Sequence, residues 1–237
     1  MVTPIFFLSL VALLISVFSG VYFLYLWFTS GKKHAFLLFW AYALGTILWF
    51  KIPNILINAG FSAVQSDYYI FFYVTLLVGF LAYPALIWGL ISFRGFSQKK
   101  YYISFFLIWF FASAVYYLLS FFAEGFDISY APVWAGHLLF FIPAQICLSY
   151  RLWRTGQWSS PTHNIPKSSI LLASLGTYIL TCTSILYILT QIGAVHRGYW
   201  YYAVISSPWI SVLQILSGLL LFFGFRILAL SRISGNK

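Results

Sequence analysis

Charge is scarce in this sequence, and acidic charge is scarcer still. Only 7% of the 237 residues are charged, with three Asp and Glu against thirteen Lys and Arg, whereas 62% are hydrophobic. A soluble globular domain carries charge on about a quarter of its residues. The shortage of charge therefore excludes an ordinary soluble domain and predicts a protein whose solvent is the lipid bilayer.

The formal net charge of +10 does not indicate nucleic acid as a partner. Nucleic-acid binding calls for basic residues clustered on one face of a soluble module, but here they lie in short gaps between apolar blocks. Basic residues in such gaps are typical of membrane topology signals and of contacts with anionic lipids. Membrane lipids are therefore the expected partners.

Catalytic and metal-binding patterns are also missing. Asp67, Glu124 and Asp127 all lie in or beside gaps between apolar blocks, so no carboxylate stands at membrane depth for a pump or an ion-coupled transporter. Cys147 and Cys182 each fall singly inside an apolar block, which favours buried small side chains over a disulfide or a metal site. We therefore expect neither an enzyme nor a cofactor.

What the sequence does have is long apolar runs. A helix needs roughly 20 apolar residues to cross the hydrocarbon core, and helices are expected because unpaired backbone groups have no partner in lipid. The predicted fold is an all-α membrane protein, a single domain over residues 1–237 that forms a seven-transmembrane helix bundle. The seven blocks lie near residues 4–29, 35–58, 68–93, 101–123, 130–151, 167–192 and 198–230.

The basic residues orient this bundle. All thirteen Lys and Arg except Lys51 and Arg197 fall in alternate gaps, on one side of the membrane. By the positive-inside rule that side is the cytoplasm. The sequence therefore predicts a multi-pass protein of a prokaryotic cell membrane, with its N-terminus outside and its C-terminus in the cytoplasm.

Lys51 stands apart because it lies within the second block, near its outer end. In the favoured interpretation, its apolar stem is buried while the ammonium reaches the lipid headgroups. In the alternative, the side chain turns inward, where it anchors an anionic ligand or pairs with Glu124 or Asp127.

Three further polar residues share the outer half with Lys51: Asn54, His137 and Ser207. His137 is expected roughly 8 Å below the start of its helix, where a hydrogen bond within the bundle is favoured over ligand binding. Polar groups at a common depth can line one cavity, or they can serve as contacts between helices. These four residues are the candidate ligand-binding site.

Three segments carry a resemblance to a known family: Phe39-Trp-Ala-Tyr-Ala-Leu-Gly45, Leu81-Ala-Tyr-Pro-Ala-Leu86 and Ser217-Gly-Leu-Leu-Leu-Phe-Phe-Gly-Phe-Arg226. They resemble the N-terminal seven-transmembrane sensory region of bacterial histidine-kinase-type receptors. In that family the last helix continues into an output domain, whereas this sequence ends at Lys237. The resemblance therefore implies a sensing module that works alone or through a separate cytoplasmic output protein.

Two functions are expected. The first is a non-enzymatic membrane sensor or receptor-like module, in which an outer-half cavity receives a small or lipidic ligand and the last helix relays the signal inward. The second is a transporter or channel for a neutral or lipid-like solute. It would use helices kinked by the prolines inside the apolar blocks, although neighbouring helices can also pack around a proline. Those prolines are Pro53, Pro84, Pro143 and Pro208.

Overall fold

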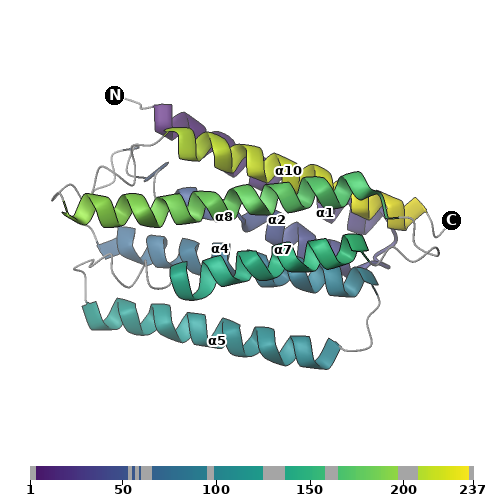
Figure 1. Cartoon of the computed structure of the whole chain (residues 1–237), viewed down its shortest axis with the longest axis horizontal. Coiled ribbons are helices and arrows are strands. Elements are labelled where there is room, and N and C mark those ends of the chain that lie inside the picture. The colour runs from purple at the N-terminus through teal and green to yellow at the C-terminus, as the bar shows by residue number, and fades with distance from the viewer. Residues whose placement is uncertain are drawn as a thin grey trace.

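In the part of the chain that it describes, the computed structural model consists of helices and the turns that connect them (Figure 1). The described residues are 4–52, 55–56, 59, 66–94, 99–124, 137–157, 165–196 and 208–234. They contain seven α-helices, namely α1 (Pro4–Thr29), α2 (Ala35–Thr46), α4 (Ser66–Arg94), α5 (Lys99–Glu124), α7 (Ile142–Gln157), α8 (Lys167–His196) and α10 (Pro208–Ser234). Two short elements join them: the 3₁₀ turn η1 (Trp49–Lys51) and the π-helix η2 (His137–Phe141).

Among the described residues, three stretches are long and apolar enough to cross a membrane: all of α1, residues Lys167–Leu186 of α8, and all of α10. These lengths confirm a helical protein suited to a membrane, because about 20 apolar residues span the hydrocarbon core. The predicted blocks 4–29, 68–93, 101–123 and 167–192 each coincide with one helix to within a few residues.

The prediction for the second block was wrong. A continuous helix was expected over 35–58, but α2 ends at Thr46 and a 3₁₀ turn follows. The break is local: Leu48 has φ −105° and ψ 12°, outside the α-helical region. The Thr46 hydroxyl also bonds back to the Tyr42 carbonyl at 2.8 Å, a contact that often bends helices. Lys51 therefore lies on a turn.

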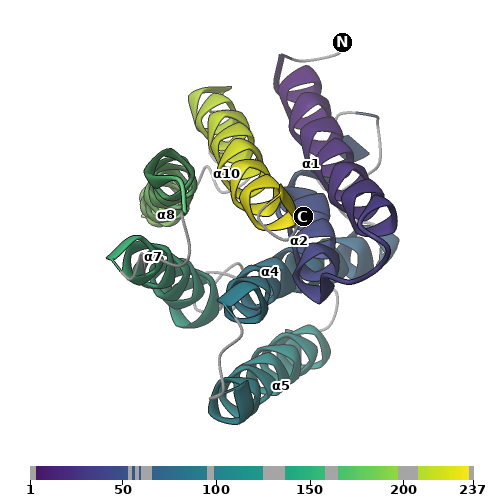
Figure 2. The ribbon, with the colours of Figure 1, turned by 90° about the vertical axis from the view of Figure 1, so that its right-hand side faces the viewer.

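The helices form a bundle in which α4 has neighbours on several sides (Figures 1 and 2). Helix α1 lies beside α2 and α10, and α8 lies between α10 and α7, while α5 sits on the outside of the bundle next to α4. Pro84 is inside α4, as the proline pattern predicts. Pro208 is the first residue of α10 as described, and the residues before it lie outside the described part of the chain, so a kink there stays a prediction.

Trp40 of α2 is the centre of the packed core. Its ring is fully buried and meets Phe23 of α1, Phe93 of α4 and Phe225 of α10 at centroid distances of 6.0, 5.7 and 4.8 Å. Aromatic pairs at these separations add to the stabilisation from burial alone. One side chain therefore ties together four helices from both ends of the sequence.

Glycines set how closely the helices approach. A Cβ on Gly20 of α1 would lie 2.8 Å from the Cα of Gly45 in α2. A Cβ on Gly224 of α10 would lie 2.6 Å from the backbone nitrogen of Ala173 in α8. Both contacts are backbone against backbone, so small residues are required at these crossings, as is usual between membrane helices.

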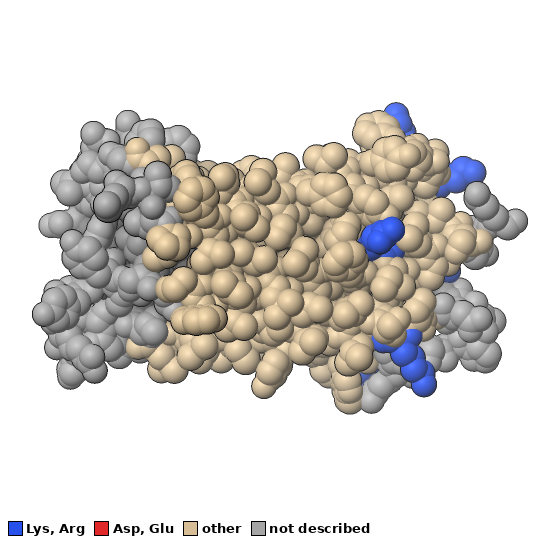
Figure 3. All heavy atoms as spheres, turned by 90° about the horizontal axis from the view of Figure 1, so that it is seen from above, with Lys and Arg blue, Asp and Glu red and all other residues tan. Residues whose placement is uncertain are grey.

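Apart from the buried Lys51, the described Lys and Arg side chains gather at one end of the bundle, as the face in Figure 3 shows. This basic end includes the turn between α1 and α2 and the last turns of α10. Arg226 of α10 donates from Nε to the Tyr22 hydroxyl of α1 at 3.0 Å, which fixes the two helices together near this end. The clustering agrees with the charge asymmetry of the sequence.

Candidate functional site

Lys51 turns into the protein. Its side chain is only 5% exposed, and Nζ donates a hydrogen bond to Oγ of Ser211 in α10 at 3.0 Å. The favoured expectation that the ammonium reaches the headgroups was therefore wrong: the side chain turns inward, as in the alternative, while the anionic ligand or acidic partner of that alternative stays a prediction. The cause is tertiary: the 3₁₀ turn after α2 directs the side chain toward the first turn of α10.

Two more polar side chains are buried on the helices around this contact. Gln214 lies one turn after Ser211 on α10 and is 6% exposed, while Ser9 of α1 is fully buried. Within the described residues, neither Oε1 of Gln214 nor Oγ of Ser9 has a hydrogen-bond partner. A buried acceptor without a partner costs about 1–3 kcal/mol, so both atoms favour an added donor at this place.

The alignment of α1 with α10 puts Ser9 at the depth of Ser211. The two helices run in the same direction (Figure 1), and Gly218 of α10 lies against Ile15 of α1 and Leu48. Ser211 is seven residues before Gly218, and Ser9 is six before Ile15, so at 1.5 Å per residue both lie about 10 Å from that contact. We refer to Ser9, Lys51, Ser211 and Gln214 as the Lys51 centre.

The other predicted site residues are not brought to the Lys51 centre by the described structure. Asn54 and Ser207 lie outside the described residues, and so do Asp127 and the side chain of Glu124, the two suggested ion-pair partners. His137 is the first residue of η2, and its side chain is also outside the description. The four-residue site therefore remains a prediction, with Lys51 alone placed.

Sequence reasoning missed Ser211 and Gln214, although a signal was present. Ser211, Gln214 and Gly218 recur at intervals of three and four residues, which places them on one face of α10. Ser217 continues that face, and its hydroxyl donates to the Gly176 carbonyl of α8 at 2.7 Å. A stripe of polar and small residues on an otherwise apolar helix indicates the buried side of α10.

A second buried polar group joins α4, α7 and α8. Nε2 of Gln145 donates to the Tyr83 hydroxyl at 2.8 Å and to Oγ of Ser184 at 3.0 Å. Gln145 and Tyr83 are each 1% exposed. Hydrogen bonds of this kind hold membrane helices together, so this network is structural in the first instance.

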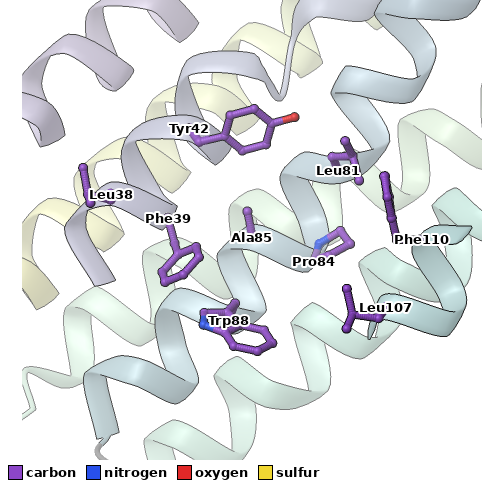
Figure 4. A pocket seen from close by; sticks show the side chains of 9 residues that line it. All are labelled: Leu38, Phe39, Tyr42, Leu81, Pro84, Ala85, Trp88, Leu107 and Phe110. Atoms are coloured by element: carbon purple, nitrogen blue, oxygen red, sulfur yellow. The ribbon is translucent and has the colours of Figure 1, made fainter. Parts of the chain in front are cut away.

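An apolar groove lies elsewhere, in the half of the bundle nearer the basic end (Figure 4). It has a volume of about 520 Å³ and runs between α2, α4 and α5. Pro84 and Trp88 form part of its α4 wall, and Tyr42 forms part of the α2 wall (Figure 4). This groove is separate from the Lys51 centre. The Lys51 centre lies at the first turn of α10, and the basic end of the bundle is at the last turns of that helix.

The Lys51 centre has the chemistry of an acceptor-binding site. An ammonium and a hydroxyl can both donate to a carboxylate, phosphate or carbonyl oxygen, and Oγ of Ser9 and Oε1 of Gln214 can each accept from a hydroxyl or an amine. In a comparison with known proteins, no family model, curated protein or solved structure matches this chain.

Proposed function

We propose that this chain is a non-enzymatic sensor of the cell membrane, with seven membrane-spanning helices, an outer N-terminus and a cytoplasmic C-terminus. A small ligand that carries an acceptor oxygen binds at the Lys51 centre, and α10 relays the binding toward the basic end. The observation that carries this proposal is the buried hydrogen bond from Lys51 to Ser211 of α10.

The bond gives the ligand a means to act on α10. A charged ammonium in a membrane protein is costly to bury and is normally held by partners. A ligand oxygen that accepts from Lys51 would compete with the Ser211 hydroxyl and so alter the contact between η1 and the first turn of α10. At 1.5 Å per residue, α10 extends about 35 Å from this contact at Ser211 to its last residue, Ser234, at the basic end.

The inner part of α10 is well placed for a relay. It packs directly on the α8 backbone at Gly224 and is bonded to α1 through Arg226. These contacts favour movement of α10 as one body together with its neighbours. A separate cytoplasmic output protein would read that movement, which agrees with the resemblance to sensory regions of histidine-kinase-type receptors.

The test is native mass spectrometry of the protein purified in mild detergent, with extraction of any bound small molecule. Lys51→Met removes the ammonium and keeps an apolar chain of similar length, while Lys167→Met removes an exposed ammonium at the start of α8. We expect the wild type and Lys167→Met to carry the same bound molecule and Lys51→Met to lose it, with equal helix content by circular dichroism. Retention by Lys51→Met, or a bare wild-type protein, would contradict the proposal.

The second candidate is a carrier or channel for a neutral or lipid-like solute. It is favoured by the apolar groove between α2, α4 and α5 and by Pro84 in the groove wall. Flux measured in proteoliposomes separates the two functions: solute movement that persists in Lys51→Met would support the carrier.

A further inference from the structure

We propose that the groove between α2, α4 and α5 is a binding site for an anionic phospholipid, with one acyl chain in the groove and the phosphate at the basic ends of the same three helices. This site is independent of the Lys51 centre and of the sensor function proposed for it.

The lining of the groove suits a hydrocarbon chain. Nearly all of its surface is carbon, and the hydroxyl of Tyr42 already donates to the Val78 carbonyl at 3.3 Å. The remaining polar group is the indole N–H of Trp88, the groove residue of α4 nearest the basic end. A volume of about 520 Å³ lies within the range of ligand pockets, about 300–1,000 Å³. The lining residues are Leu38, Phe39, Tyr42, Leu81, Pro84, Ala85, Trp88, Leu107 and Phe110.

The groove opens sideways onto an apolar surface. Leu107 on its rim is 50% exposed, and the adjacent Ile108 is 69% exposed. Both belong to α5, which lies on the outside of the bundle (Figure 2). A surface this apolar faces lipid, so a chain enters from the bilayer and no polar ligand from water is expected there.

Basic residues at one end of the groove favour a lipid with an anionic headgroup. Lys33 lies in the turn two residues before α2 and five residues before the first groove residue, Leu38; on α4, Arg94 is six residues after Trp88. On α5, Lys99 is eight residues before Leu107. At 1.5 Å per residue, Arg94 and Lys99 lie about 9–12 Å beyond the groove along α4 and α5, and Lys33 lies beyond it toward the same end, just before α2.

That spacing fits a phospholipid whose acyl chain begins in the groove. The glycerol and ester groups would lie at the level of Trp88, where an indole N–H is typical of the membrane interface. The phosphate would then lie among the three helix ends. Each basic residue near an anionic headgroup contributes about fivefold in affinity, so three predict a preference of about a hundredfold over a zwitterionic lipid.

The first experiment compares phosphatidylglycerol with phosphatidylcholine of identical acyl chains by lipid titration in native mass spectrometry. Ala85→Phe places a ring in the groove, and Ala112→Phe adds the same ring to an exposed position of α5 outside it. We expect the wild type and Ala112→Phe to retain phosphatidylglycerol preferentially, and Ala85→Phe to retain at least about tenfold less. Equal retention by both variants would overturn the assignment of the chain to the groove.

The headgroup is tested by Lys33→Gln, with Lys167→Gln at the start of α8 as the matched control. The first variant is expected to weaken phosphatidylglycerol binding about fivefold and the second to leave it unchanged. Equal binding of the two lipids by the wild type would overturn the phosphate site.

A third measurement needs no variant and therefore does not depend on the folding of Ala85→Phe. Phosphatidylglycerol with a photoreactive diazirine in its acyl chain is crosslinked to the wild-type protein in nanodiscs, and the labelled peptides are mapped. Labels are expected at 38–42, 81–88 and 107–110 above the level on exposed residues of α8 such as Leu171 and Tyr178. Uniform labelling of all lipid-facing helices would contradict a defined site.

Discussion

Gly224→Ala is the substitution that best tests how α8 and α10 pack. The added Cβ would lie 2.6 Å from the Ala173 nitrogen, 2.8 Å from the Ser169 carbonyl oxygen and 2.9 Å from the Ala173 Cβ. Two of these neighbours are backbone atoms, so no rotamer change relieves the contact. The helices themselves would have to separate by several tenths of an ångström.

Gly218→Ala is the matched control on the same helix. Its Cβ would meet Cδ1 of Leu48 at 3.0 Å, and its other neighbours lie at 3.7 Å or more. The end of a leucine side chain can move by the small amount required. Both substitutions gain the same helix-propensity benefit of about 0.5–1 kcal/mol, so the difference between them isolates the steric term.

Forcing an extra methyl group into a packed interior costs about 1–3 kcal/mol. We therefore expect the free energy of unfolding of Gly224→Ala to lie about 1–3 kcal/mol below that of Gly218→Ala, which should be close to wild type. The assay is equilibrium unfolding in mixed micelles with rising sodium dodecyl sulfate, followed by circular dichroism. Equal stability of the two variants would refute the backbone contact between α8 and α10.

Two further predictions concern single polar groups. Tyr83→Phe removes the hydroxyl that accepts from Gln145, and we expect a loss of about 0.6–2 kcal/mol in the same unfolding assay; unchanged stability would show that this bond does not hold α4 to α7. Burial, followed by the positive charges of Arg232 and Lys33, lowers the pKa of His34 below its ordinary value of 6.5. The unfolded chain therefore binds a proton on His34 more readily than the folded chain does. The contribution of His34 to the free energy of unfolding is complete above pH 6.5 and falls as the pH decreases below that value. His34→Gln should flatten that part of the pH profile, and an identical profile for the variant would contradict this assignment.

The helices could be predicted because the bilayer leaves the backbone few choices. An apolar run such as residues 4–29 has to satisfy its own hydrogen bonds, and the structure confirms α1 over the same residues. The break after Thr46 could not be predicted in this way. The break falls within the apolar run Ile47-Leu-Trp-Phe50, and the turn is defined by the conformation of Leu48.

The direction of the Lys51 side chain, like the break after Thr46, could not be predicted from the sequence. A lysine near the end of an apolar block can reach the headgroups or turn inward, and the local sequence is compatible with both. The choice depends on Ser211, which is 160 residues away in the chain and 3.0 Å away in the structure. The groove is similar in this respect, because Leu107 in its wall and Leu118 on the open surface have the same kind of apolar neighbours in sequence.

The amino-acid sequence was enough to predict a lipid solvent, the helical class and the separation of charge, because these follow from composition and from the cost of exposing polar backbone to lipid. It did not determine which side chains meet. The tertiary structure decided that Lys51 contacts Ser211, that Gly224 packs against the α8 backbone, and that a groove lies between α2, α4 and α5. The physical reason is that apolar helices are alike along their length, so their partners are chosen by the fit of small, large and polar residues across each interface.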